Sequence, residues 1–375
     1  MNKIPGFLLI LIFLFSACST ENEDKTPDNE KEENSFDREA MLVNWADNII
    51  LPAFQNFESS TRTLEEQTTA FIQDPSVAKL EVIRSAFRTA YLDFQSVSMF
   101  EIGKAEQLNY RNFLNTYPAN TTNIREKIET GSYNLELPSS YAEQGFPALD
   151  FLINGLGANE AEIVSFYTEN PNASAYKSYL EAVSTRINAL TVEVSDSWHG
   201  DYRDTFVNNT SSSSTGAVDK FTNDYVMYFE KFLRSGKIGY PAGAFTGEPS
   251  PQNTEAYYAN DFSKELYLKA LESVQDFFNG VHFDGSSAGK SYKQYLDYLD
   301  SIKEGANLGE LINLQFDTIK AQADSLDASL KEQVRTNNTP MLEAFDLLQM
   351  AVVLLKVDMM QALSISVDYV DSDGD

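Results

Sequence analysis

The sequence predicts an all-α protein with two helical halves. Apolar residues recur every three or four positions along four long segments, a pattern typical of amphipathic helices. No stretch shows the sustained two-residue alternation of a half-buried strand, so a large sheet is not expected. Hydrophobic residues make up 42% of the 375-residue chain, which is ample for a core of this size.

Taken in order, the first expected helices cover residues 36–57 and 77–100, and Pro52 should kink the first of them because its ring cannot continue the helical hydrogen bonding. A further helix is expected over 256–278. The four apolar stripes give the remaining helices: Tyr176, Tyr179, Val183, Ile187, Leu190 and Val194; Val218, Phe221, Tyr225, Tyr228 and Phe232; Ile312, Phe316, Ile319, Ala323, Leu326 and Leu330; Met341, Phe345, Leu348, Val352, Leu355 and Met359.

The last helix, at about 340–364, carries further apolar residues off its stripe, and we predict that it is central and buried on most sides. Breaks are expected at 131–140 and at 208–216, and the two halves should divide near 200–216. The segment 235–253 holds four glycines and three prolines. We predict that it is a long irregular connection, a kind of segment that is more often functional than decorative.

The N-terminus has the features of a secretory signal over residues 1–17. Lys3 supplies a positive charge, and an apolar run from Phe7 to Phe15 leads to small residues and Cys18. Cys18 is the only cysteine, and its position resembles a bacterial lipobox, which predicts lipidation after cleavage at Ala17. The alternative is an ordinary cleaved signal. Residues 18–35 then form a lipidated cysteine and a flexible acidic tether, followed by one domain over 36–375.

The formal net charge is −28, which makes nucleic acid an improbable partner because phosphate backbones would be repelled. Charge-driven binding to an anionic membrane surface is disfavoured for the same reason. The expected membrane contact is the lipid on Cys18, which places the protein in the cell envelope as an outer-membrane lipoprotein, facing the periplasm or the surface.

The segment that begins Gly145-Phe146-Pro147-Ala148-Leu149-Asp150 and continues as an apolar run resembles the signature of the imelysin family, Gly-x-His-x-x-Glu. That family comprises bacterial envelope proteins named for an insulin-cleaving membrane protease. Here Pro147 stands at the histidine position and Asp150 at the glutamate position. Pro147 is expected to begin a short helix, because its fixed φ and missing N–H suit the first helical position. Asp150 would then lie near the positive helix end, either as a site residue or simply as a group that favours the helix start.

A second segment, Gly236 to Gly243, resembles the Lys-x-Gly-x-Pro-x-Gly stretch of imelysin-like second halves. The candidate ligand-binding residues are therefore Asp150, Lys237, Gly239 and Tyr240, and Lys237 could pair with Asp150 or with an anionic ligand. We predict that Asp150 and this segment line one cleft between the halves. Lys237 as a solvated side chain is the alternative. Arg88 is a further candidate for orienting a carboxylate, with a solvated or structural role as its alternative.

The sequence offers little support for a metal or a cofactor. Only two histidines are present, His199 and His282, and neither belongs to a His-Glu-x-x-His helix. No phosphate loop or dinucleotide fingerprint occurs. A metal is therefore not supported by ligand spacing, and the cofactor is not specified.

The resemblance implies two helical-bundle repeats and a role near iron or haem uptake. On this basis we expect a ligand-binding or accessory lipoprotein. The first alternative is an imelysin-type peptidase, which would need the imidazole that Pro147 replaces. The second alternative is a structural surface lipoprotein.

Overall fold

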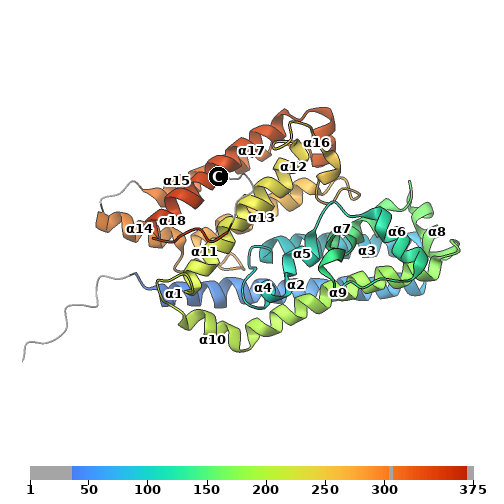
Figure 1. The fold of residues 1–375 in the computed structure, drawn as a ribbon, viewed down its shortest axis with the longest axis horizontal. Helices are drawn as coiled ribbons and strands as arrows, with labels where there is room; N and C mark the ends of the chain where they lie inside the picture. Colours follow the sequence, from blue (N-terminus) through green and yellow to red (C-terminus); the bar gives the residue numbers. More distant parts are fainter. Residues whose placement is uncertain (1–35, 304–306, 370–375) are drawn as a thin grey trace, which may run out of the picture. The chain divides into compact units, whose positions relative to one another are not determined.

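The structure is a computed structural model that describes residues 36–303 and 307–369 (Figure 1). The predicted signal, Cys18 and the tether lie outside these residues. The described residues from Asp37 onward belong to one compact unit. It is helical, and the described residues contain no strand, which confirms the all-α prediction.

The first helices pack around α2, which lies along both α3 and α9 (Figure 1). The predicted break between residues 131 and 140 is present between α6 and the 3-10 turn η2. Up to residue 208 the elements are α1 (Arg38–Val43), η1 (Asn44–Ile50), α2 (Leu51–Gln73), α3 (Val77–Val97), α4 (Lys104–Leu108), α5 (Tyr110–Asn115), α6 (Thr121–Thr130), η2 (Pro138–Glu143), α7 (Gly145–Asp150), η3 (Phe151–Gly155), α8 (Glu160–Thr168), α9 (Ala173–His199) and α10 (Asp201–Asn208).

After the loop at 209–216, a second group of helices packs with α17 against both η4 and α15, and α13 joins the two groups by packing on α3 (Figure 1). These elements are α11 (Ala217–Met227), η4 (Tyr228–Gly239), α12 (Tyr240–Ala242), η5 (Pro251–Asn253), α13 (Ser263–Asn279), α14 (Tyr292–Lys303), α15 (Leu308–Ala323), α16 (Leu330–Thr336), α17 (Thr339–Val352), η6 (Val353–Met359) and α18 (Met360–Ala362). The division of the chain near 200–216 remains a prediction.

Several long helices contain π-helical stretches, namely η1, η3, η4 and η6. The stretch η1 directly precedes Pro52, which is the second residue of α2. Proline has no N–H to donate and its ring crowds the preceding turn, so the regular hydrogen bonding changes at this point. The change before Pro52 is a π-helical segment within a continuous helical run, and the predicted kink at Pro52 stays a prediction.

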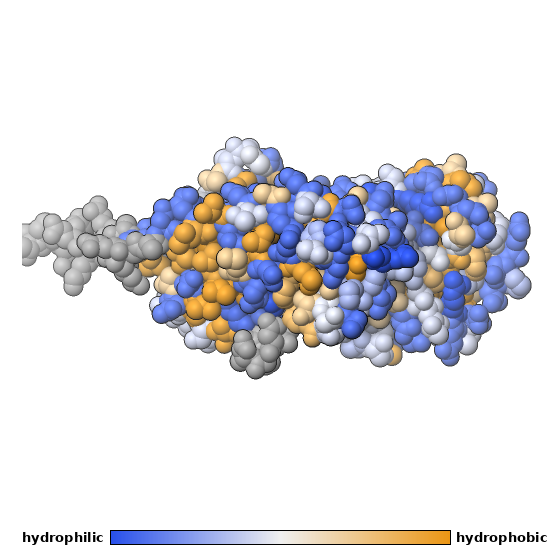
Figure 2. Space-filling model, turned by 90° about the horizontal axis from the view of Figure 1, so that it is seen from above, coloured by the Kyte–Doolittle hydropathy of each residue, from blue (hydrophilic) through white to orange (hydrophobic). Residues whose placement is uncertain are grey.

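The final helix differs from its prediction. Its stripe is buried, with Leu348 and Leu355 fully inaccessible, but Met350, Val353 and Val357 are 56%, 45% and 53% exposed. The helix is therefore amphipathic with an apolar outer face, not a central helix buried on most sides. Figure 2 shows apolar side chains interspersed with hydrophilic ones on one face of the molecule.

Candidate functional site

The motif segment begins with a glycine that its surroundings require. Gly145 starts α7 with a φ of +72°, a conformation that residues with a side chain rarely adopt. A Cβ atom at this position would lie 2.2 Å from the carbonyl oxygen of Leu114. The close approach of α7 to the end of α5 therefore depends on Gly145.

The rest of α7 enters the core, as predicted for its apolar residues. Phe146 is fully buried and stacks on Tyr91, with ring centroids 4.4 Å apart. Pro147 is the third residue of α7, where its missing N–H leaves no hydrogen bond unmade because the first four N–H groups of a helix lack intrahelical partners. The prediction that Pro147 begins a short helix is correct for the helix but wrong for its first residue, because α7 begins two residues earlier, at Gly145.

Asp150 is the last residue of α7, not a first-turn residue, so it does not stabilise the helix start as one interpretation supposed. It is 1% exposed. Its carboxylate accepts hydrogen bonds from the backbone N–H groups of Tyr258 at 2.7 Å and Ala259 at 2.8 Å, and from the Asn154 side chain at 3.0 Å. Burial raises the pKa of Asp150 to about 6, against the opposing effect of these three donors.

The segment 235–253 is less irregular than predicted. Its first part continues the helix through η4 and α12, and the chain turns only at Gly243, whose φ is +73°. A Cβ at Gly239 would lie 2.8 Å from the rings of Phe245 and Phe345. Gly239 therefore allows close packing within a helix and does not break the helix. The glycine and proline content of segment 235–253 predicted an irregular connection, and this prediction is wrong for the first part of the segment.

Lys237 lies on η4 and is 3% exposed. Its ammonium group pairs with Glu255, which is 2% exposed, and donates to the Gln95 side chain at 2.8 Å. Glu255 also accepts a hydrogen bond of 2.7 Å from Asn115. Burial lowers the pKa of Lys237, and the negative charge of Glu255 opposes that effect. Of the roles considered for Lys237, pairing with Asp150 and a solvated side chain are both wrong, because the buried Lys237 pairs with Glu255.

Asp150 and Lys237 both hold the same stretch of chain, residues 252–259, which we call the bridging segment. Lys237 binds it at Glu255, and Asp150 binds its backbone at Tyr258 and Ala259. Lys331 of α16 adds a hydrogen bond of 2.9 Å to the backbone carbonyl of Tyr257. Sequence reasoning assigned residues from 256 onward to a helix, but α13 begins only at Ser263.

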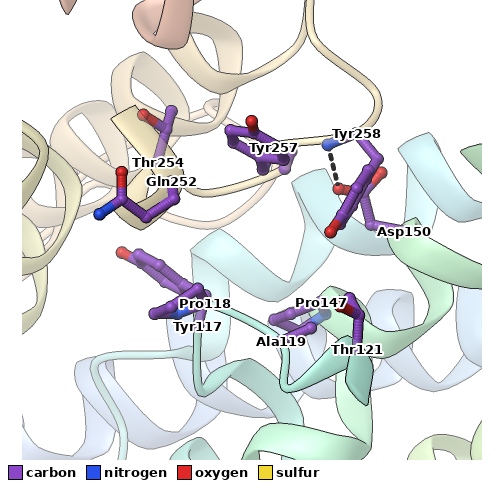
Figure 3. Close-up of a pocket in the computed structure, with 11 residues that line it drawn as sticks. Tyr117, Pro118, Ala119, Thr121, Pro147, Asp150, Gln252, Thr254, Tyr257 and Tyr258 are labelled. Carbon is purple, nitrogen blue, oxygen red and sulfur yellow. Dashed lines mark hydrogen bonds between the residues drawn. The ribbon is translucent and has the colours of Figure 1, made fainter. Parts of the chain in front are cut away.

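A cavity of about 320 Å³ lies beside the motif, and we call it the motif cavity (Figure 3). The bridging segment forms one wall, and α7 and the chain before α6 form the other. Its lining residues are mostly neutral: Tyr117, Pro118, Ala119, Thr121, Pro147, Asp150, Gln252, Thr254, Ala256, Tyr257 and Tyr258. The hydroxyl of Thr254 is buried there without a hydrogen-bond partner, an arrangement that is uncommon in folded proteins.

Two neighbouring cavities meet the motif cavity at Tyr117. A small cavity of about 20 Å³ is lined by Lys237, and a larger one of about 380 Å³ is lined by Gly236 and Tyr240. Tyr117 lines all three. The two segments singled out in the sequence thus border adjoining cavities.

Arg88 lies outside this site. It makes surface ion pairs with Asp261 at 2.9 Å and Glu265 at 3.4 Å, and its guanidinium group stacks over the ring of Phe262. It lines none of the three adjoining cavities. The structural role weighed for Arg88 is the one observed.

The key residues that sequence reasoning missed are Glu255, Asn115 and Tyr117. None of them belongs to a motif, and a glutamate in a polar stretch gives no sign that it will be buried. The only available signal was the length of the connection before α13. Within residues 36–303 and 307–369, no group of three or more histidine, cysteine, aspartate or glutamate side chains is arranged to hold a metal ion.

Comparison with known proteins identifies the family. The family model of Peptidase M75, described as Imelysin, matches residues 50–352. An imelysin-like protein from Psychrobacter arcticum 273-4 has a similar structure, with a TM-score of 0.66 and 15% identity over 88% of this chain and 96% of that one. A candidate iron-regulated protein A precursor from Parabacteroides distasonis ATCC 8503 has a TM-score of 0.68 and 16% identity, over 84% and 93% respectively. No curated protein matches the sequence.

Proposed function

This chain belongs to the imelysin family, and on that premise we propose that it is a ligand-binding or accessory protein of the cell envelope and not a peptidase. The observation that carries the proposal is the state of Asp150. Its carboxylate is engaged by two backbone N–H groups and an amide, so it anchors the bridging segment. A general base must instead be within reach of a substrate proton.

Pro147 supports the same conclusion. It occupies the histidine position of the family motif and lines the motif cavity, where it supplies neither a metal ligand nor a base. The cavity itself remains, with neutral hydrogen-bonding groups and aromatic rings around it. A cavity lined in this way suits binding, since pockets commonly combine apolar walls with a few polar groups.

A cleavage assay tests the proposal directly. We expect the purified mature protein to leave an unfolded polypeptide such as reduced casein intact in a mass-spectrometric time course. Cleavage by the wild type that is abolished by Asp150→Ala and retained by the surface variant Asp261→Ala would contradict the proposal and favour the peptidase alternative.

We further propose that the role lies near iron or haem acquisition, a link supported by the name of the Parabacteroides protein. The motif cavity contains tyrosines but no histidine, cysteine or methionine, so a tyrosine would have to hold the iron of any haem bound there. Haem titration followed by absorbance is the measurement. A haem complex whose spectrum is unchanged in Tyr117→Phe, Tyr257→Phe and Tyr258→Phe would exclude this cavity as the haem site.

The anchoring at Cys18 belongs to the same proposal. None of the described helices is long and apolar enough to cross a membrane. Acyl chains on Cys18 would supply stable attachment, since each buried methylene contributes about 0.8 kcal/mol. We expect Cys18→Ala to move the protein from the membrane fraction to the soluble fraction after cell lysis. An unchanged membrane fraction would contradict lipidation.

A further inference from the structure

The cavity beside Gly236 has an unusual lining for this protein. It has a volume of about 380 Å³ and ten lining residues, of which Lys231 is the only charged one. The whole chain carries a net charge of −28, yet no carboxylate faces this space. We call it the amide cavity, because three asparagines line it: Asn112 and Asn115 from α5, and Asn253 from η5.

Two of these amides have no partner. Asn112 and Asn253 are half-buried, and neither side chain makes a hydrogen bond to any other part of the described chain. Each primary amide offers two donor hydrogens and one acceptor oxygen. By contrast, Asn115 on the same wall is engaged with Tyr91 and Glu255. The cavity therefore presents two free sets of neutral donors and acceptors that converge from α5 and η5.

An aromatic ring stands at the same cavity. Tyr240 is 46% exposed, which is high for a large aromatic side chain, and its ring is held at 5.1 Å from that of Phe245. Phe245 in turn packs edge-on against Phe345 at 5.4 Å. The Tyr240 ring thus packs against Phe245 and keeps nearly half of its surface exposed.

We propose that the amide cavity binds a neutral polyhydroxylated ligand of the saccharide class. A sugar hydroxyl both donates and accepts, which matches a primary amide, and the C–H face of a sugar ring packs on an aromatic ring such as Tyr240. An inorganic cation would find no carboxylate here. An anion would find only Lys231, whose ammonium group already lies 5.5 Å from the centre of the Tyr369 ring. This site is distinct from the motif cavity and does not depend on the peptidase question.

The test uses the full mature protein and a panel of glucose, galactose, mannose, N-acetylglucosamine, maltose and lactose. Saturation-transfer NMR and calorimetry should detect at least one of these with a Kd of about 1 mM or lower. Asn112→Ala, Asn253→Ala and Tyr240→Ala should each weaken that binding by about 10-fold or more. The near-isosteric variant Asn112→Asp should also weaken sugar binding. It replaces Asn112→Ala in the test if the alanine variant fails to fold.

Matched controls separate this cavity from general effects. Asn208→Ala and Phe283→Ala change an exposed asparagine and an exposed aromatic residue that line neither this cavity nor the motif cavity, and they should leave the Kd unchanged. Binding that is lost in Gln252→Ala but retained in Asn112→Ala would place the sugar in the motif cavity and overturn the proposal. Absence of binding across the panel by both methods would also overturn it.

Discussion

Two buried carboxylates hold the bridging segment in different ways. Glu255 faces a buried ammonium group, Lys237, and an amide, Asn115. Asp150 faces only neutral donors at hydrogen-bonding distance, two of them backbone N–H groups. Burial raises the pKa of Tyr91, and the negative charges of both carboxylates add to that effect.

The difference shows what each carboxylate contributes. A buried ion pair is strongly coupled, because removing one partner leaves the other as an uncompensated charge. A carboxylate that accepts only neutral hydrogen bonds can take up a proton and retain part of its contacts. Glu255 and Lys237 should therefore act as a unit, whereas Asp150 should act alone and respond to pH.

The largest effect is expected at the ion pair. Glu255→Gln leaves the Lys237 ammonium group buried without a counter-charge, and we expect the free energy of unfolding to fall by about 3–5 kcal/mol. The double variant Glu255→Gln with Lys237→Met should lose less than the single variant. Urea denaturation measures both. A double variant less stable than Glu255→Gln alone would show that the two residues do not act as a unit. Glu265→Gln, at a surface pair that is 53% exposed, is the control.

A smaller loss is expected at Asp150. Asp150→Ala leaves the N–H groups of Tyr258 and Ala259 without their acceptor, and each unsatisfied buried donor costs roughly 1–3 kcal/mol. We expect a total loss of about 2–4 kcal/mol at pH 7, together with faster hydrogen exchange at these two amides. Unchanged exchange at both amides would mean that Asp150 does not anchor the bridging segment. Asp261→Ala, whose side chain is 70% exposed, should change stability little.

The smallest effect is a pH dependence. The pKa of Asp150 is about 6 in the folded protein, above its ordinary value of 3.8. The folded state therefore binds this proton more tightly, so the stabilisation is present below about pH 4 and is lost as pH rises through 6. At about 1.4 kcal/mol per pKa unit, the change is at most about 3 kcal/mol. Asp150→Asn should lack this slope in stability curves between pH 4 and 7, and an identical slope in both proteins would assign it elsewhere.

The helical class and most helix positions could be predicted because apolar periodicity reports burial directly. Gly145 and Phe146 could be identified from the motif, but the partner of Asp150 could not. The backbone N–H groups of Tyr258 and Ala259 are present in any sequence, and only the path of the chain brings them to a carboxylate 108 residues away. Gly236 and Gly239 led to the wrong prediction of an irregular connection, because glycine allows close packing of helices as well as turns. The prediction that the final helix is buried on most sides was wrong, because apolar content does not by itself determine which face of a helix is covered by other helices.

The requirement for glycine at position 145 bears on how much of the family motif is preserved by folding alone. The carbonyl oxygen of Leu114 excludes any side chain there whether or not an imidazole stands two residues later. Packing alone can therefore preserve the glycine of the motif, whatever residue stands at the histidine position. A sequence that retains only the glycine and the apolar run carries information about ancestry and architecture, and its activity has to be read from the residues between them.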